Sequence, residues 1–148
     1  RSVGIPPLSV ERLEDLRRVR GEIEGVAAAW AAANATPDLM ARLDALIARM
    51  ESATTDDDRI SFVPANREFH FTIYRAAGSE SLMAVIEPLW LQIGPYLSLL
   101  RGSGNWRLAN HQHRAIRDAL AVGDGPAARV ALRADIDEAA AILARLLA

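Results

Sequence analysis

The 148-residue sequence contains no cysteine and no lysine, and only 5% of its residues are aromatic. The absence of cysteine excludes disulfides, thiolate zinc sites, iron–sulfur clusters and cysteine nucleophiles. Because the formal net charge is only −2, the chain also lacks a basic footprint for a nucleic-acid backbone. We find no signal peptide and no run near the roughly 18 uncharged apolar residues of a membrane span, so we expect a cytoplasmic protein without membrane contact.

About half of the residues, 51%, are apolar, which predicts one globular domain with a sizeable core. We assign residues 1–7 to the remnant of a linker and residues 8–148 to this domain. The chain starts with Arg1 rather than Met, so we expect that a further segment precedes it.

Apolar residues recur with a helical period along most of the chain, and no segment alternates with period two. The predicted fold is therefore an all-α antiparallel bundle of about six helices. Thr36, Ser79, Asn105 and Asp124 are expected N-caps of the second, fourth, fifth and sixth helices. The predicted helices cover residues 10–33, 37–52, a third stretch carrying 62–73, 80–101, 106–120 and 125–148.

Prolines and glycines modify this pattern at several places. Pro64 marks either the start of the third helix or a bend in it. The fourth helix contains Pro88, Gly94 and Pro95, so we expect it to be bent. Gly123 suits a left-handed position at the end of the fifth helix.

A few polar residues fall on the apolar faces of the predicted helices. His113 shares a face with apolar residues three and seven positions later, whereas His111 points away from that face. His70 lies one turn after Asn66 on an inward face of the third helix. Asp135 lies on or beside the apolar stripe of the last helix, where an unpaired carboxylate would be costly and therefore needs a partner.

Two imidazoles, a carboxylate and an amide oxygen are suitable ligands for a divalent ion such as zinc, nickel, manganese or iron. The alternative is that each residue is a hydrogen-bonded polar group of the core, and helical phase alone favours this alternative. In that case His70 and His113 would bond to the backbone or to each other. Asp135 would pair with an arginine such as Arg133, Arg117 or Arg67.

Several short strings in a fixed order resemble one known family. They are NREFH at residues 66–70, AAGS at 76–79, HRAI at 113–116, GD at 123–124 and LRAD at 132–135. The alanine-rich segment 20–33 is similar to the opening of the same family, with Glu24 in its glutamate position. On these residues the chain resembles the C-terminal effector domain of GntR-type transcriptional regulators, the FadR-like group called FCD.

The resemblance implies an all-helical sensing domain that follows an N-terminal winged helix-turn-helix, which binds operator DNA as a homodimer. It also implies a divalent metal held by one Asp and three His, with a small organic acid bound over it. By position the ligands here would be Asn66, His70, His113 and Asp135. Asn66 replaces the family's Asp and Asp135 replaces its last His, so the formal charge is conserved. The same two changes would also arise in a lineage that had given up the metal.

We expect an effector to contact five residues. The family positions of Arg20 and Glu24 place them beside the pocket, although their spacing is also typical of a simple ion pair. The fourth helix lacks the arginines of metal-binding relatives, which favours a partly hydrophobic acid, with Gln92 and Tyr96 as hydrogen-bond donors. Arg101 could clamp a carboxylate. The three tryptophans are expected to be core or interface anchors.

The leading hypothesis is a ligand-sensing domain without enzymatic activity, in which an effector favours one dimer geometry and so alters operator binding. A second hypothesis is a helical-bundle hydrolase that uses a metal ion to activate water. The chain lacks the paired Glu-x-x-His arrangement of carboxylate di-iron bundles, which argues against catalysis. A metal-free effector-binding bundle and a purely structural bundle are the remaining alternatives.

Overall fold

The computed structural model describes residues 7–104, 106–107 and 110–148, so most of the expected linker remnant lies outside it. The described residues form helices without any strand, which confirms the predicted all-α fold. The helices are α1 (Val10–Ala33), α2 (Pro37–Thr55), α3 (Arg59–Ala76), α4 (Glu80–Gly102), α5 (Asn110–Ala121) and α6 (Gly125–Leu147).

Side-chain caps set most of the helix starts. The side chains of Thr36, Ser79 and Asp124 each accept a hydrogen bond from a backbone N–H three residues ahead, as predicted. Ser9 caps α1 and Asp58 caps α3 in the same way. A cap of this kind stabilises a helix by about 1 kcal/mol, so the capped positions define where these helices begin.

Two helix ends differ from the prediction. The second helix does not stop near Ser52 but continues to Thr55. The hydroxyls of its last two threonines donate to carbonyls one turn earlier. The fifth helix begins at Asn110. The expected cap, Asn105, lies outside the described residues, but the start predicted there is wrong because Trp106 and Arg107 are not helical.

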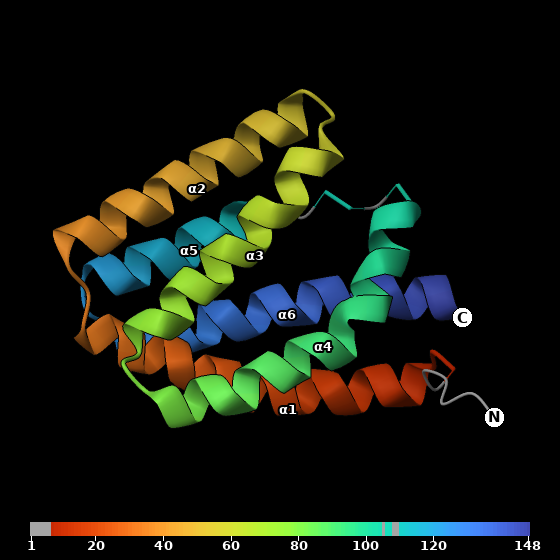
Figure 1. Cartoon of the computed structure of the whole chain (residues 1–148), viewed down its shortest axis with the longest axis horizontal. Helices are drawn as coiled ribbons and strands as arrows, with labels where there is room; N and C mark the ends of the chain where they lie inside the picture. Colours follow the sequence, from red (N-terminus) through yellow and green to blue (C-terminus); the bar gives the residue numbers. More distant parts are fainter. Residues whose placement is uncertain (1–6, 105, 108–109) are drawn as a thin grey trace.

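The proline-containing helices change direction. Proline cannot donate to the carbonyl four residues earlier, which weakens the helix at that point. The ribbon of α4 turns sharply in its second half, which contains Pro95, and this confirms the predicted bend (Figure 1). Pro64 lies inside α3, whose first turns run at an angle to the rest of the helix.

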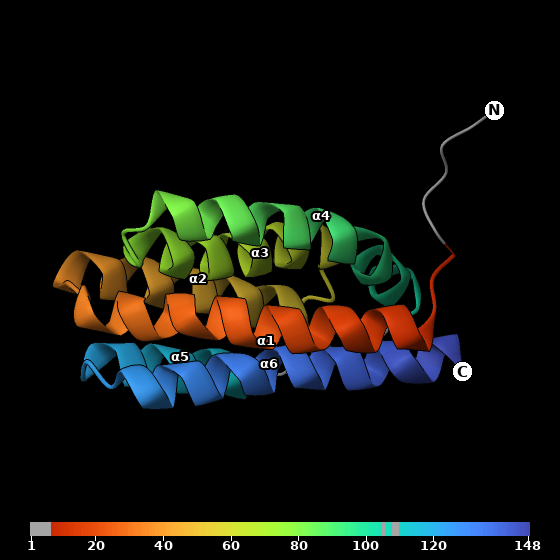
Figure 2. The same ribbon diagram turned by 90° about the horizontal axis from the view of Figure 1, so that it is seen from below.

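The helices pack in layers. Figure 2 shows α5 and α6 side by side on one face of the bundle, α3 and α4 on the opposite face, and α1 between them. The most extensive contact joins α1 to α6. These two helices approach closely because α6 begins with Gly125, where a Cβ would lie only 3.2 Å from the Ala29 carbonyl oxygen.

The apolar core has two parts. The main cluster contains residues from all six helices, with Ile86 and Trp90 from α4, and it includes many alanines that allow the helices to approach. A second cluster joins the first half of α1, the second half of α4 and the end of α6. The second half of α4 therefore covers one end of the bundle.

One described helix, α4, has the length and mean hydropathy of a membrane span, contrary to our expectation of no such segment. Its length and its low content of charged residues are the whole basis of this likeness to a membrane span. Ile86, Leu89 and Ile93 are nevertheless buried inside the bundle, and two prolines interrupt the helix. We therefore interpret α4 as a bundle helix.

Two glycine substitutions test the local backbone. Gly123 has a φ of +70°, so Gly123→Ala should lower the free energy of unfolding by about 1 kcal/mol because a Cβ is strained there. Gly102 has an ordinary φ and open space around its Cβ position. Gly102→Ala should therefore raise that free energy by roughly 0.5 kcal/mol. Urea unfolding measures both, and equal effects would contradict the conformation at Gly123.

Candidate functional site

Three titratable side chains converge at the centre of the bundle. His70 comes from α3, His113 from α5 and Asp135 from α6, and they are 3%, 0% and 6% exposed. The Nε2 atom of His70 lies 2.8 Å from Asp135 Oδ2, and the Nε2 atom of His113 lies 3.5 Å from Asp135 Oδ1. One potential ligand atom from each residue lies within 4.8 Å of the others. The convergence expected from helical phase is thus found.

Hydrogen bonds fix the orientation of both imidazoles. The Nδ1 atom of His70 donates to the Asn66 backbone carbonyl at 2.8 Å, and the Nδ1 atom of His113 donates to Asn110 Oδ1 at 2.8 Å. Both partners are acceptors, so Nδ1 carries a proton in each ring. The Nε2 atoms are left facing Asp135, an arrangement typical of histidines that bind metals through Nε2.

Asp135 is paired with histidine and not with arginine. The expectation that an arginine would balance Asp135 in a hydrogen-bonded core is therefore wrong. The arginines considered as its partners have other contacts: Arg133 pairs with Glu22, and Arg117 pairs with Asp44. Arg67 lies over the Phe71 ring at 4.1 Å. His111, as predicted, is exposed, and its Nε2 atom lies 3.7 Å from a Glu138 oxygen.

Two buried polar atoms around this cluster have no hydrogen-bond partner among the described residues. They are Asn66 Oδ1 and His113 Nε2. Both offer a lone pair, because the amide oxygen only accepts and the His113 proton is on Nδ1. Buried atoms without partners are rare in proteins. Since both atoms belong to the four expected metal ligands, the residues present fit a bound cation.

The charges within the cluster are strongly coupled. Burial alone would lower the pKa of His70, but its hydrogen bond to Asp135 and the Asp135 charge outweigh burial and hold that pKa above the usual value. Burial alone would raise the pKa of Asp135, but the hydrogen bond from His70 and the nearby positive charges keep it low. Burial lowers the pKa of His113 to about 4. His113 is therefore neutral near pH 7, as a metal ligand must be.

These pKa shifts predict separate titrations of the two histidines in metal-free protein. His113 should gain its second proton only near pH 4, whereas His70 should lose its second proton above its ordinary value of 6.5. Correlation spectra of the 15N-labelled imidazoles across a pH series measure both events. Simultaneous titration of the two rings near pH 6.5 would contradict their burial around Asp135.

The expected pair Arg20 and Glu24 is buried, not superficial. Arg20 Nε donates to Glu24 at 2.6 Å, and the Glu24 side chain is completely buried. Glu24 also accepts hydrogen bonds from the Tyr74 hydroxyl at 2.5 Å and from Trp90 Nε1 at 2.9 Å. One carboxylate therefore ties α1 to α3 and α4 beside the histidine cluster.

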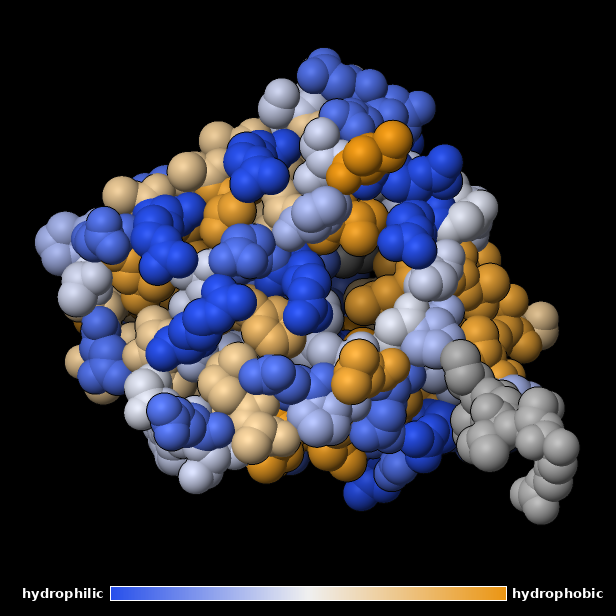
Figure 3. Space-filling view, in the orientation of Figure 1, coloured by the Kyte–Doolittle hydropathy of each residue, from blue (hydrophilic) through white to orange (hydrophobic). Residues whose placement is uncertain are grey.

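A pocket of about 260 Å³ opens between α3, the second half of α4 and the segment before α5. Asn66 and Arg101, both expected site residues, line it, and so do Phe62, Trp90 and Trp106. Figure 3 shows a hollow at this position with hydrophobic atoms around it (Figure 3). The pocket adjoins the histidine cluster, because the ring centroid of Trp90 lies 5.6 Å from that of His70.

Two expected effector contacts lie elsewhere. Gln92 is exposed, and its side-chain oxygen accepts a hydrogen bond from Arg12 at 2.6 Å. Tyr96 is buried in the second core cluster, where its hydroxyl lies 3.4 Å from the Ser9 amide at the start of α1. Neither residue lines the pocket, because the lining residues of α4, which include Trp90, Gly94 and Arg101, share a different face of the helix.

Four residues near the site were not singled out by their sequence positions. Asn110 orients His113, and its position three residues earlier on the same helix would have indicated this. Arg67 lines the pocket, but the sequence suggested it only as a partner of Asp135. The spacing of apolar residues does not distinguish Trp90 and Trp106, as pocket residues, from ordinary core residues. Trp106 also lies outside any helix.

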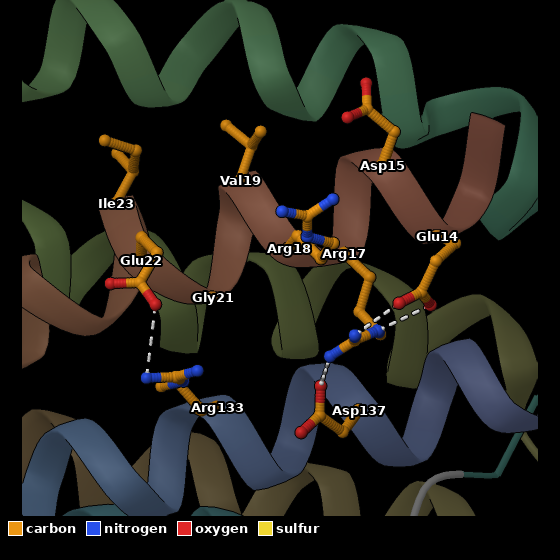
Figure 4. A pocket seen from close by; sticks show the side chains of 10 residues that line it. All are labelled: Glu14, Asp15, Arg17, Arg18, Val19, Gly21, Glu22, Ile23, Arg133 and Asp137. Atoms are coloured by element: carbon orange, nitrogen blue, oxygen red, sulfur yellow. Dashed lines mark hydrogen bonds and ion pairs between the residues drawn. The ribbon is translucent and has the colours of Figure 1, made fainter. Parts of the chain in front are cut away.

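A wider surface groove, of about 690 Å³, runs between α1 and α6 (Figure 4). Figure 4 shows Arg17 between Glu14 and Asp137, and an ion pair of Arg133 with Glu22. Most charges in this groove are thus paired with one another. The groove lies apart from the histidine cluster, so we do not regard it as the candidate site.

Comparison with known proteins places the chain and its fold in a family. The chain is similar to the HTH-type transcriptional regulator McbR of Escherichia coli K12, with 32% identity over 96 residues, which are 65% of this chain and 43% of McbR. The chain thus spans less than half the length of that relative. The solved structure of E. coli McbR/YncC superposes with a TM-score of 0.88 at 29% identity, covering 95% of this chain and 71% of that one.

The FCD domain family model matches residues 15–138. This match includes His70, His113 and Asp135, and it agrees with the resemblance carried by the sequence strings. The chain therefore belongs to the FCD domain family.

Proposed function

We propose that this chain is the effector-binding domain of a transcriptional regulator whose separate N-terminal domain binds operator DNA. Membership of the FCD family and the likeness to McbR, which is named a transcriptional regulator, support this role. The net charge of −2 agrees with a domain that does not itself contact DNA. The effector would act by stabilising one arrangement of the two DNA-binding domains over another.

Within this domain we propose a divalent metal site made by His70, His113 and Asp135, with the Asn66 side-chain oxygen as a further ligand. The observation that carries the proposal is the pair of buried lone-pair atoms without partners, Asn66 Oδ1 and His113 Nε2. A bound ion would satisfy both atoms and would replace the Nε2 proton of His70. The nitrogen and oxygen ligands suit zinc, nickel, manganese or iron.

The charge of this ligand set also favours an anionic effector. With neutral imidazoles, Asp135 supplies the set's only negative charge, so a divalent ion would leave excess positive charge beside the pocket. The ion would then supply a Lewis-acidic position that attracts a carboxylate. A small organic acid in the adjoining pocket would neutralise the excess positive charge of the ion and its ligands.

A hydrolytic role is less well supported than a regulatory one. Water activation at a metal needs a base that is free to accept a proton. Glu24 is the other buried carboxylate in the described part of the chain, and it already accepts hydrogen bonds from three side chains. The similarity of the chain to a transcriptional regulator also favours a regulatory role over a hydrolytic one.

We also propose that the domain forms a homodimer, as the family resemblance implies. Multi-angle light scattering of the purified chain should give twice its 16.1 kDa mass. A monomer at micromolar concentration would contradict this part of the proposal.

The regulatory role is tested by operator binding of the whole protein that carries this domain. Gel-shift titrations with and without small organic acids should show an affinity change of roughly tenfold for the true effector. Failure of the whole protein to bind any DNA would overturn the role.

A further inference from the structure

The pocket beside the histidine cluster has an unbalanced charge. Arg67 and Arg101 line it, and no carboxylate lines it. Neither arginine forms an ion pair with a carboxylate in the described ranges. The Arg101 guanidinium donates to the Ser98 hydroxyl at 3.2 Å, and the Arg67 guanidinium lies against aromatic rings. This differs from the groove of Figure 4, whose arginines are largely paired. Two uncompensated guanidinium groups favour an anion.

Three aromatic residues contribute to the pocket wall, together with the aliphatic side chains of Val63, Leu97 and Leu100. Phe62 and Trp106 lie edge to face with ring centroids 5.2 Å apart, and both are buried. Trp90 lines the pocket from α4, and its indole N–H is held by Glu24. The chain has few aromatic residues, 5% in total, yet three of them meet here. Such walls favour a planar ring, which they can contact in offset or edge-to-face geometry.

The pocket volume limits the size of the ligand. Its volume of about 260 Å³ lies below the roughly 300–1,000 Å³ of pockets for drug-sized molecules. An apolar cavity of about 150 Å³ is enough to bind benzene. The space therefore suits one ring with a short acidic arm.

We propose that the pocket binds a single-ring aromatic carboxylate, with the ring among Phe62, Trp90 and Trp106 and the carboxylate on Arg101 and Arg67. This inference rests on the proposed function, because it names the class of effector for that same site. A short dicarboxylate fits less well, since its second charged group would lose water against indole and phenyl rings. An aliphatic acid of equal size would lack the ring contacts.

Calorimetric titration of the 148-residue chain with phenylacetate tests the proposal. Phenylacetamide has the same ring without the charge, and cyclohexylacetate has the same charge without the aromatic face. Phenylacetate should bind roughly tenfold more tightly than phenylacetamide and about fivefold more tightly than cyclohexylacetate. Each titration is run with zinc and with a chelator, because the arginines and rings do not depend on the metal.

Matched variants locate the binding. Arg101→Gln should weaken phenylacetate binding roughly tenfold, whereas Arg49→Gln, an equal charge change on the exposed face of α2, should leave it unchanged. Trp106→Leu should also weaken binding, and Trp30→Leu should not, because Trp30 is exposed on α1. Circular dichroism spectra verify that each variant is folded.

The outcomes separate this inference from the proposed function. If succinate binds and phenylacetate does not, the acid-binding role stands and the aromatic class is overturned. If zinc binds but none of the acids does, the metal site stands and the ligand proposal is overturned. Equal binding of phenylacetate to the Arg101→Gln and Arg49→Gln variants would also overturn it.

Discussion

Replacing Glu24 by glutamine is expected to lower the free energy of unfolding by about 3–5 kcal/mol, which is the usual cost of breaking a buried ion pair. Glutamine has nearly the same shape and can still accept hydrogen bonds from Tyr74 and Trp90. It cannot balance the Arg20 guanidinium, which is only 7% exposed. The uncompensated charge of Arg20 therefore accounts for most of the expected loss, and it should lower the melting temperature by roughly 10 °C.

Urea unfolding followed by circular dichroism measures this effect. Glu14→Gln is the matched control, because Glu14 lies on the same helix and pairs with Arg17 at the surface; its effect should stay within about 0.5 kcal/mol. The double variant Arg20→Gln/Glu24→Gln should regain part of the loss. Equal unfolding midpoints for Glu24→Gln and Glu14→Gln would contradict the burial of the pair.

Divalent metal should stabilise the chain by a similarly large amount. Zinc or nickel at about 100 times its dissociation constant should add about 2.7 kcal/mol to chelator-treated protein, because it binds the folded state only. The expected increase in melting temperature is roughly 5–10 °C. The physical reason is that a bound ion would satisfy Asn66 Oδ1 and His113 Nε2, two buried atoms that have no hydrogen-bond partner among the described residues.

Two histidines provide the control for this experiment. His113 is buried in the cluster and His111 is exposed, although they are only two positions apart. His113→Ala should abolish the increase in melting temperature, and His111→Ala should retain it. A metal-induced increase that persists in His113→Ala would assign the binding to another place on the chain.

The fold was largely predictable because local signals agreed with the packing. The caps Thr36, Ser79 and Asp124 and the apolar period identified the helices and most of their ends. The start of α5 was mispredicted because residue 106 is a tryptophan that packs against Phe62 outside any helix. Such a tertiary contact leaves no periodic signal.

The site was only partly predictable. Helical phase was sufficient for His70, His113 and Asp135, since each lies on an inward face of a regular helix. Phase did not identify the partner of Asp135, because a carboxylate on an apolar stripe can pair with any nearby cation. Gln92 and Tyr96 were assigned to the pocket because relatives carry effector-facing arginines in this part of the fourth helix. In the structure both side chains contact the start of α1 and its preceding residue instead of lining the pocket.

Elemental analysis of the purified chain tests the metal proposal most directly. The wild-type chain and the His111→Ala variant should carry close to one equivalent of zinc, nickel, manganese or iron, and the His70→Ala/His113→Ala variant should carry none. Absence of metal from the wild-type chain, even after dialysis against these ions, would contradict the proposal. The cluster would then be a hydrogen-bonded polar group within the core.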